Sequence, residues 1–180
     1  MHTNTMLSGS ILAAGNNLEI AQAWAQELKR PVAELEATIN AEFADAVTAP
    51  SIPVDHLTET LQQLKQMGYI LGVATMDSEQ GIQSTLAAFD CLPLFGFLAG
   101  YDSGYGSKPG PGMVHGFCQV MQLQPEQVMV VGDNTHDLHM GLSAGAGAVV
   151  GVLTGTSVAG DLHEADYVLD SIAGLPELLA

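Results

Sequence analysis

Positive charge is scarce in this 180-residue sequence. It has only four lysines and arginines against 20 aspartates and glutamates, which gives a formal net charge of −16. Nucleic acids and anionic membranes are bound through basic patches, so neither is expected as a partner. Any lysine that lies in a cleft of so acidic a chain therefore becomes a candidate for anion binding.

Cysteines and long apolar runs are scarce as well. Cys91 and Cys118 form neither a Cys-x-x-Cys unit nor a disulfide framework, which favours a reducing, cytoplasmic location. The first residues lack the basic and then apolar pattern of a signal peptide. The apolar stretch 144–153 is interrupted by glycines and is too short to span a bilayer, so we expect a soluble protein.

Hydrophobic residues and glycines are abundant, at 47% of the chain and 20 residues respectively, which fits an α/β protein with tight turns. Apolar runs of strand length are found at 69–74, 95–99, 128–131, 148–152 and 167–169. Helical patterns are found at 17–28, 31–43, 57–67, 79–89, 113–121 and 175–179. This alternation predicts a parallel sheet with helices on both faces.

A boundary is expected at residues 49–53, where two prolines stiffen the chain. It would separate a helical pair, residues 1–49, from a core, residues 50–180. The first helix carries Ile20, Trp24 and Leu28 at a spacing of four, which predicts one buried face. The helical pair could be a lid over a crevice or two simple packing helices, and the sequence leaves both open.

The run 128–131 has four apolar residues, three of them β-branched, which predicts a strand buried on both faces. Asp133 follows its carboxyl end, and Asp137 lies at the start of the next helix. Ligands of open α/β sheets bind off the carboxyl ends of strands, so both carboxylates are expected in the crevice. Oxygen ligands of this kind suit Mg²⁺. Alternatively, Asp133 is a turn residue and Asp137 is only a helix N-cap.

Two further candidates follow other strands. The Thr75 hydroxyl and the backbone amide of Met76 lie at a strand end and helix start, where anions are favoured. Lys108 lies in a glycine-rich and proline-rich loop, where it could neutralise a phosphate, hold a carboxylate or be a solvated surface residue. Proline follows it, so this is no P-loop. A zinc or iron site at His136 and His139 is disfavoured, because His139 would lie on another helical face.

These motifs resemble those of the haloacid dehalogenase (HAD) superfamily, and most closely its phosphoglycolate-phosphatase-like members. The segment 132–146 is similar to the family's last motif, Gly72–Thr75 to its second and Lys108–Pro111 to its third. The resemblance implies a three-layer Rossmann-like core preceded by a partial helical cap. It also implies a Mg²⁺-dependent phosphomonoester hydrolase acting on a small phosphorylated metabolite or binding phosphate. Asp133 and Asp137 would hold the metal, and Thr75, Met76 and Lys108 the phosphoryl group.

One family motif has no counterpart. HAD enzymes carry a nucleophilic aspartate in an Asp-x-Asp-x-Thr segment on their first strand, whereas the first aspartate here is Asp45, outside any apolar strand. We therefore expect the first core strand to be missing between the strands that end at Thr75 and Val131. Either those strands close on each other, or another segment or chain fills the gap, as in a homodimer or with a strand-donating partner.

Two functional hypotheses follow from this departure. The first is a phosphatase lineage without its nucleophile and with weak Mg²⁺ binding, since one carboxylate contact would be lost. The second is a catalytically silent remnant that acts as a binding or interaction module.

Overall fold

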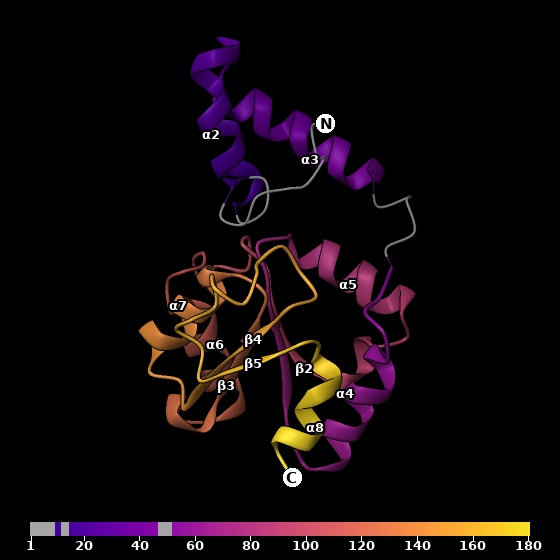
Figure 1. Cartoon of the computed structure of the whole chain (residues 1–180). Coiled ribbons are helices and arrows are strands. Elements are labelled where there is room, and N and C mark those ends of the chain that lie inside the picture. The colour runs from indigo at the N-terminus through magenta and orange to yellow at the C-terminus, as the bar shows by residue number, and fades with distance from the viewer. Residues whose placement is uncertain (1–9, 12–14, 47–51) are drawn as a thin grey trace, which may run out of the picture.

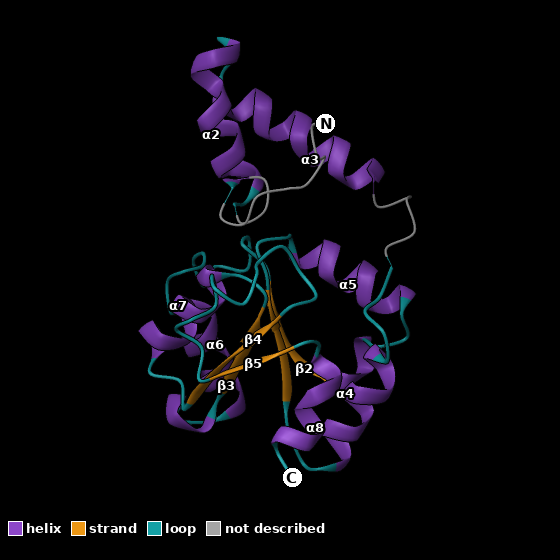
Figure 2. Ribbon diagram, viewed as in Figure 1, coloured by secondary structure: helices purple, strands orange, loops and turns teal. Residues whose placement is uncertain are grey.

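The computed structural model describes residues 10–11, 15–46 and 52–180, and it confirms an α/β architecture (Figures 1 and 2). Its helices are α2 (Asn17–Leu28), α3 (Val32–Ala46), α4 (Leu57–Gln66), α5 (Glu79–Ala88), α6 (Gly112–Met121), α7 (Thr135–Ala144) and α8 (Leu175–Leu178). Its strands are β1 (Leu71–Ala74), β2 (Phe95–Ala99), β3 (Met129–Gly132), β4 (Ala148–Val152) and β5 (Tyr167–Leu169). Strands and helices alternate from β1 to β4, as the sequence pattern predicts, and β5 follows β4 without a helix between them.

The described strands pair in parallel, but they form two sheets. β1 pairs with β2, while β3, β4 and β5 pair in that order. The registers place Ala74 beside Ala99 and Gly132 beside Gly151, so paired strands end level with each other. Within the described chain β1 and β3 do not pair, and each keeps one free edge. The sequence left open whether these two strands close on each other or leave a gap. In the structure they leave a gap.

Helices cover both faces of the strands, which gives three layers (Figure 2). On the side of α6 and α7, a first core contains Phe97, Ala99, Met113, Val114, Cys118, Val130, Leu138, Met140, Ala144, Val149 and Leu162. On the side of α4 and α8, a second core contains Leu64, Val150 and Leu175, with Met129 and Val131 packed against it. Side chains alternate along a strand, so successive residues of β3 reach different cores. This arrangement confirms the prediction that β3 packs on both faces.

The helical pair α2 and α3 lies beyond the carboxyl ends of the strands (Figure 1). A capping box begins α2: the Asn16 side chain accepts a hydrogen bond from the Glu19 N–H, and the Glu19 carboxylate accepts one from the Asn16 N–H, each at 2.9 Å. The division into 1–49 and 50–180 stays a prediction. Residues 49–51 of the predicted boundary lie outside the described part.

Two local predictions need correction. β1 begins at Leu71 rather than at Tyr69, because Tyr69 still donates its N–H to the Leu64 carbonyl, at 3.1 Å, in the turn that ends α4. The predicted buried face of α2 is confirmed at Ile20, which is 3% exposed, but Trp24 and Leu28 are 42% and 51% exposed. α2 packs chiefly on α3, and one neighbouring helix covers only a narrow strip of its surface.

Candidate functional site

The turn from β3 into α7 positions both predicted metal ligands. Asn134 is the N-cap of α7, and its side chain accepts a hydrogen bond from the His136 N–H at 3.1 Å. Asp137 is the third residue of the helix, and its Oδ2 accepts a hydrogen bond from the Asn134 N–H at 3.0 Å. This capping box holds the Asp137 carboxyl group at the end of the strand. The alternative that made Asp137 the N-cap is therefore wrong, because Asn134 takes that position.

Lys108 reaches this turn from the glycine-rich loop. Its Nζ lies 2.5 Å from Oδ1 of Asp137, and the two side chains are only 12% and 9% exposed. Lys108 is therefore not a solvated surface lysine, and it holds a carboxylate, which is one of the roles that the sequence left open. Two opposite charges removed from water depend on each other, since either one left alone would be buried without a partner.

Asp133 is held from the other side by the loop after β4. Its Oδ2 accepts a hydrogen bond from the Thr156 N–H at 3.2 Å. A β-carbon at Gly155 would overlap the Asp133 carboxyl group, and one at Gly132 would overlap that of Asp137. The two glycines therefore leave the space that the two carboxylates occupy.

Thr75 and Met76 are placed differently from the other candidates. Thr75 directly follows β1. Its N–H donates a hydrogen bond to the Ala99 carbonyl at 2.9 Å, and its Oγ1 accepts one from the Asp77 N–H at 3.2 Å. The amino end of α5 is already capped, by the Ser78 side chain and by Asp102, whose Oδ1 accepts from the Glu79 N–H at 2.8 Å. These side chains already accept hydrogen bonds from backbone N–H groups at the start of α5. Those N–H groups are therefore not available to a bound anion.

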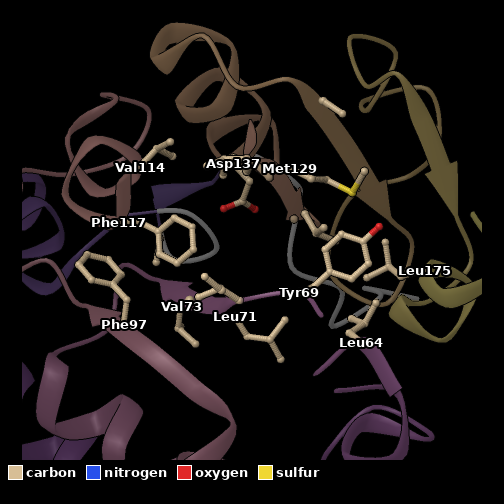
Figure 3. Close-up of a pocket in the computed structure, with 18 of the residues that line it drawn as sticks. Leu64, Tyr69, Leu71, Val73, Phe97, Val114, Phe117, Met129, Asp137 and Leu175 are labelled. Atoms are coloured by element: carbon tan, nitrogen blue, oxygen red, sulfur yellow. The ribbon is translucent and has the colours of Figure 1, made fainter. Parts of the chain in front are cut away.

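A cavity of about 740 Å³ joins three of the predicted site residues. Lys108, Asp133 and Asp137 line it at the carboxyl ends of the strands, whereas Thr75 and Met76 are not among its described lining residues. The cavity runs between β1 and β3, whose residues form facing walls. In Figure 3 the Asp137 carboxyl group is directed into this space, with Leu71 and Val73 of β1 opposite Met129 of β3.

The two carboxylates can be tested as a metal site by their donor chemistry. Among the described residues no group of three or more His, Cys, Asp and Glu side chains could hold a metal ion. Mg²⁺ commonly binds through one or two carboxylates, with water and substrate phosphate completing an octahedron, so Asp133 and Asp137 fit that ion. Asp137 must share its oxygens with Lys108 and the Asn134 amide. His139 bonds the exposed Glu164 instead, which does not support a zinc or iron site.

The helical pair approaches the same edge of the core. Nδ2 of Asn16 donates a hydrogen bond to Oγ of Ser107, the neighbour of Lys108, at 3.4 Å. A second cavity of about 580 Å³ lies between the start of α2 and His136, with Glu19 and Gln22 among its lining residues. The structure therefore supports a position of the pair over the crevice, although it does not decide between a lid and packing helices.

Tyr101 shows the charge environment beneath α3. Burial raises its pKa above the usual 10.0, and the carboxylates of Asp102, Glu36 and Asp77 raise the pKa further, while a hydrogen bond with the Asn40 side chain lowers it. Glu36 and Asn40 belong to α3, and Tyr101 belongs to the loop after β2. The phenol is thus surrounded by acids from both parts of the chain.

Sequence reasoning missed three residues that organise the site. Asn134 caps α7, Thr156 binds Asp133, and Asp102 caps α5. A signal existed for the first, because a polar residue followed by an acid three positions later is a capping-box pattern. No local signal existed for the others, since their partners lie 23 residues away along the chain.

Comparison with known proteins places this geometry in context. The chain matches the family model for haloacid dehalogenase-like hydrolases over residues 15–151. It is 36% identical over 126 residues to a phosphoglycolate phosphatase of Haemophilus influenzae, which is 69% of this chain and 56% of that one. It is 31% identical over 124 residues to pyrophosphatase PpaX of Bacillus mycoides. That match covers 68% of this chain and 57% of PpaX. The chain thus spans a little more than half the length of these relatives.

Solved structures share the fold. A predicted phosphoglycolate phosphatase from Haemophilus somnus superimposes with a TM-score of 0.78 at 24% identity, over 91% of this chain and 76% of that one. A mutant of CbbY from Rhodobacter sphaeroides, in complex with xylulose-(1,5)bisphosphate, superimposes with a TM-score of 0.77 at 21% identity, over 92% of this chain and 76% of that one.

In the described part of the chain, no helix is both long and apolar enough to cross a membrane.

Proposed function

The chain belongs to the haloacid dehalogenase-like hydrolase family, and from this premise we propose that its carboxyl-edge site binds the phosphoryl group of a small phosphorylated metabolite. The family assignment confirms the resemblance inferred from the sequence motifs. The observation that carries the proposal is the meeting of Lys108, Asp133 and Asp137 on one cavity where the strands end. A cation beside two carboxylates is a suitable arrangement for a phosphate together with a divalent metal.

Each residue has a role in this proposal. Asp133 and Asp137 would hold Mg²⁺, and the bound ion would supply positive charge to neutralise the phosphoryl oxygens. Lys108 already lies beside Asp137 and can share its charge between that carboxylate and an incoming phosphate. The Thr75 hydroxyl accepts a hydrogen bond from the Asp77 amide, so its own proton is available to a phosphoryl oxygen. The Met76 amide adds a second donor at the same strand end.

The names of related proteins support phosphorylated compounds as the class of ligand. Relatives include a phosphoglycolate phosphatase and a pyrophosphatase, and CbbY structures contain phosphate or xylulose-(1,5)bisphosphate. Which compound binds here is set by contacts beyond the phosphoryl group. The cavity between α2 and His136 is the place where we expect those contacts.

Two further parts of the proposal concern location and assembly. Cys91 and Cys118 are buried and not joined in a disulfide, which suits a cytoplasmic protein. The free edges of β1 and β3 favour a homodimer or a partner that donates a strand, since unpaired strand edges are templates for another strand.

Catalysis is where the two functional hypotheses separate. No two aspartates in these 180 residues stand two positions apart, so the chain carries no Asp-x-Asp pair. Lys108 is engaged with Asp137, and Thr75 has no described carboxylate or histidine bonded to its hydroxyl to act as a base. This favours a phosphate-binding module over a hydrolase for these 180 residues by themselves.

Turnover of a generic aryl phosphate with Mg²⁺ tests this choice. We expect these 180 residues to hydrolyse it no faster than an Asp133→Ala variant, because loss of a covalent nucleophile costs several orders of magnitude. Turnover that follows the protein through purification and disappears in Asp133→Ala would instead establish a hydrolase. Asp77→Asn would then identify whether the carboxyl group beside Thr75 is the nucleophile.

A further inference from the structure

The two oxygens of the Asp133 carboxyl group have different surroundings. Oδ2 accepts a hydrogen bond from the Thr156 N–H at 3.2 Å, whereas no described residue donates a hydrogen bond to Oδ1. Both oxygens of Asp137 are engaged, Oδ1 by Lys108 and Oδ2 by the Asn134 N–H. Oδ1 of Asp133 is therefore the one oxygen of these two carboxyl groups that no donor of the described chain occupies.

Gly155 brings the backbone directly against the Asp133 side chain. A β-carbon at this position would overlap Asp133, and the three heavy atoms nearest to it would be Oδ2, Cγ and Cβ of that residue. Gly155 does not have a positive φ, so an alanine could adopt its backbone conformation. The glycine is therefore needed here for the close approach to Asp133, and not for a turn that only glycine can form.

The segment that carries these two residues, 153–166, is called the β4–β5 loop here, and it is held at both ends and in its middle. Leu153 donates its N–H to a carbonyl of β5 at 3.0 Å. Asp166 donates its N–H to the Val149 carbonyl of β4, and its Oδ2 accepts the Val149 N–H, each at 2.8 Å. Leu162 is fully buried in the first core. The loop is therefore a firm support for the Asp133 side chain.

Contacts of this kind restrict the orientation of a metal ligand. An aspartate carboxyl group rotates about two side-chain bonds, and only some of its orientations direct an oxygen towards an ion. Thr156 engages Oδ2 of Asp133, and the backbone at Gly155 blocks rotation towards the loop. Loss of a group that orients a metal ligand typically costs about 10- to 100-fold in metal affinity.

We propose that Gly155 and Thr156 are positioning residues for Asp133, which hold its Oδ2 so that Oδ1 is the oxygen offered to a divalent cation. This role rests on the proposed function, in which Asp133 would hold Mg²⁺, and it involves only residues that the structure describes. Both residues act through Asp133 and with backbone atoms, so side-chain chemistry does not reveal them.

Two alanine variants of the full 180-residue chain separate this role from a general effect on the loop. Gly155→Ala adds a methyl group that Asp133 must avoid, because the loop is held at both ends, so the Mg²⁺ affinity should fall at least tenfold. Gly160→Ala makes the same change in the same loop, where a β-carbon meets no atom within 4 Å, and should keep the wild-type affinity. The affinity is measured from the amide NMR shifts of residues 133–137 as Mg²⁺ is added.

Hydrogen exchange of the Thr156 amide gives a second readout that needs no metal. In the wild type this N–H is bonded to Asp133, so its exchange should be at least fivefold faster in Gly155→Ala and in Asp133→Ala. The Asp166 amide of the same loop donates to β4 and should exchange at the wild-type rate in both variants. A substitution that only loosened the loop would speed exchange at both amides.

Two results would overturn the proposal. One is a Mg²⁺ affinity of folded Gly155→Ala that equals that of the wild type or of Gly160→Ala. The other is equal Thr156 exchange in the wild type and in Asp133→Ala, and this comparison decides the question if thermal unfolding shows that Gly155→Ala is not folded. If the wild type binds Mg²⁺ no better than Asp133→Ala, the proposed function fails instead, while slower Thr156 exchange in the wild type would still support the positioning of Asp133.

Discussion

At the scale of single residues, the Lys108–Asp137 pair connects stability with function. The two residues are 29 positions apart in sequence, yet their charged atoms meet in a mostly buried place. Asp137 also completes the capping box of α7, so one carboxyl group holds both the lysine and the helix end. A change at either residue is therefore expected to alter the fold as well as ligand binding.

Replacing Lys108 by methionine should lower the free energy of unfolding by about 3 kcal/mol, because it leaves a buried carboxylate without its partner. Urea unfolding measures this difference. Lys65→Met on the exposed surface of α4 is the control and should change stability by less than about 0.5 kcal/mol. Equal effects of the two substitutions would mean that the ion pair is exposed to water in solution.

Mg²⁺ should bind in the millimolar range, because two carboxylates, one of them shared with Lys108, offset little of the cost of dehydrating the ion. Isothermal titration calorimetry measures the affinity. Asp133→Asn should abolish binding, and Asp55→Asn, at an exposed position before α4, should not affect it. Micromolar affinity in the wild type would show that a further group completes the site.

At the scale of elements, the position of α3 over the core can be tested through Tyr101. Glu36 of α3 contributes to the raised pKa of Tyr101 after burial and Asp102. Glu36→Gln should therefore lower that pKa towards 10.0, whereas Glu42→Gln, farther along the helix, should not. Absorbance at about 295 nm follows the ionisation, with Tyr101→Phe identifying its contribution.

The sign of the associated stability change follows from the raised pKa. The folded state binds the phenolic proton more tightly than the unfolded chain, whose ordinary value is 10.0. The contribution to stability is present below pH 10 and is lost as the pH rises through the folded pKa. Glu36→Gln should reduce this loss. An unchanged Tyr101 titration in Glu36→Gln would mean that α3 does not lie beside Tyr101 in solution.

Elements with strong local signals were predictable from the sequence. α2 has its predicted bounds, and β2, β4 and β5 do too. Tyr69 was misplaced because a β-favourable residue is held by the turn that ends α4. The exposure of Trp24 and Leu28 depends on how many neighbours α2 has, which periodicity alone does not encode.

At the scale of the whole molecule, the sequence predicted the kind of sheet but not its connectivity. Parallel strands between two helical layers follow from the alternation of elements, and Asp133 and Asp137 follow from the position of ligands at strand ends. The Lys108–Asp137 and Thr156–Asp133 contacts depend on long-range packing. The separation of β1 from β3 depends on it too, and the sequence left this separation open as one of two outcomes. Thr75 and Met76 were predicted at the correct strand end, and their part in binding stays a prediction.

The central claim is that phosphate binds at the carboxyl edge beside Lys108. Titration of the ¹⁵N-labelled chain with inorganic phosphate and Mg²⁺, followed by NMR, tests it most directly. We predict shift changes at Lys108, Met76 and residues 133–137, which are lost in Lys108→Ala and kept in Lys65→Ala. Changes that persist in folded Lys108→Ala, or that map to residues far from this edge, would contradict the account.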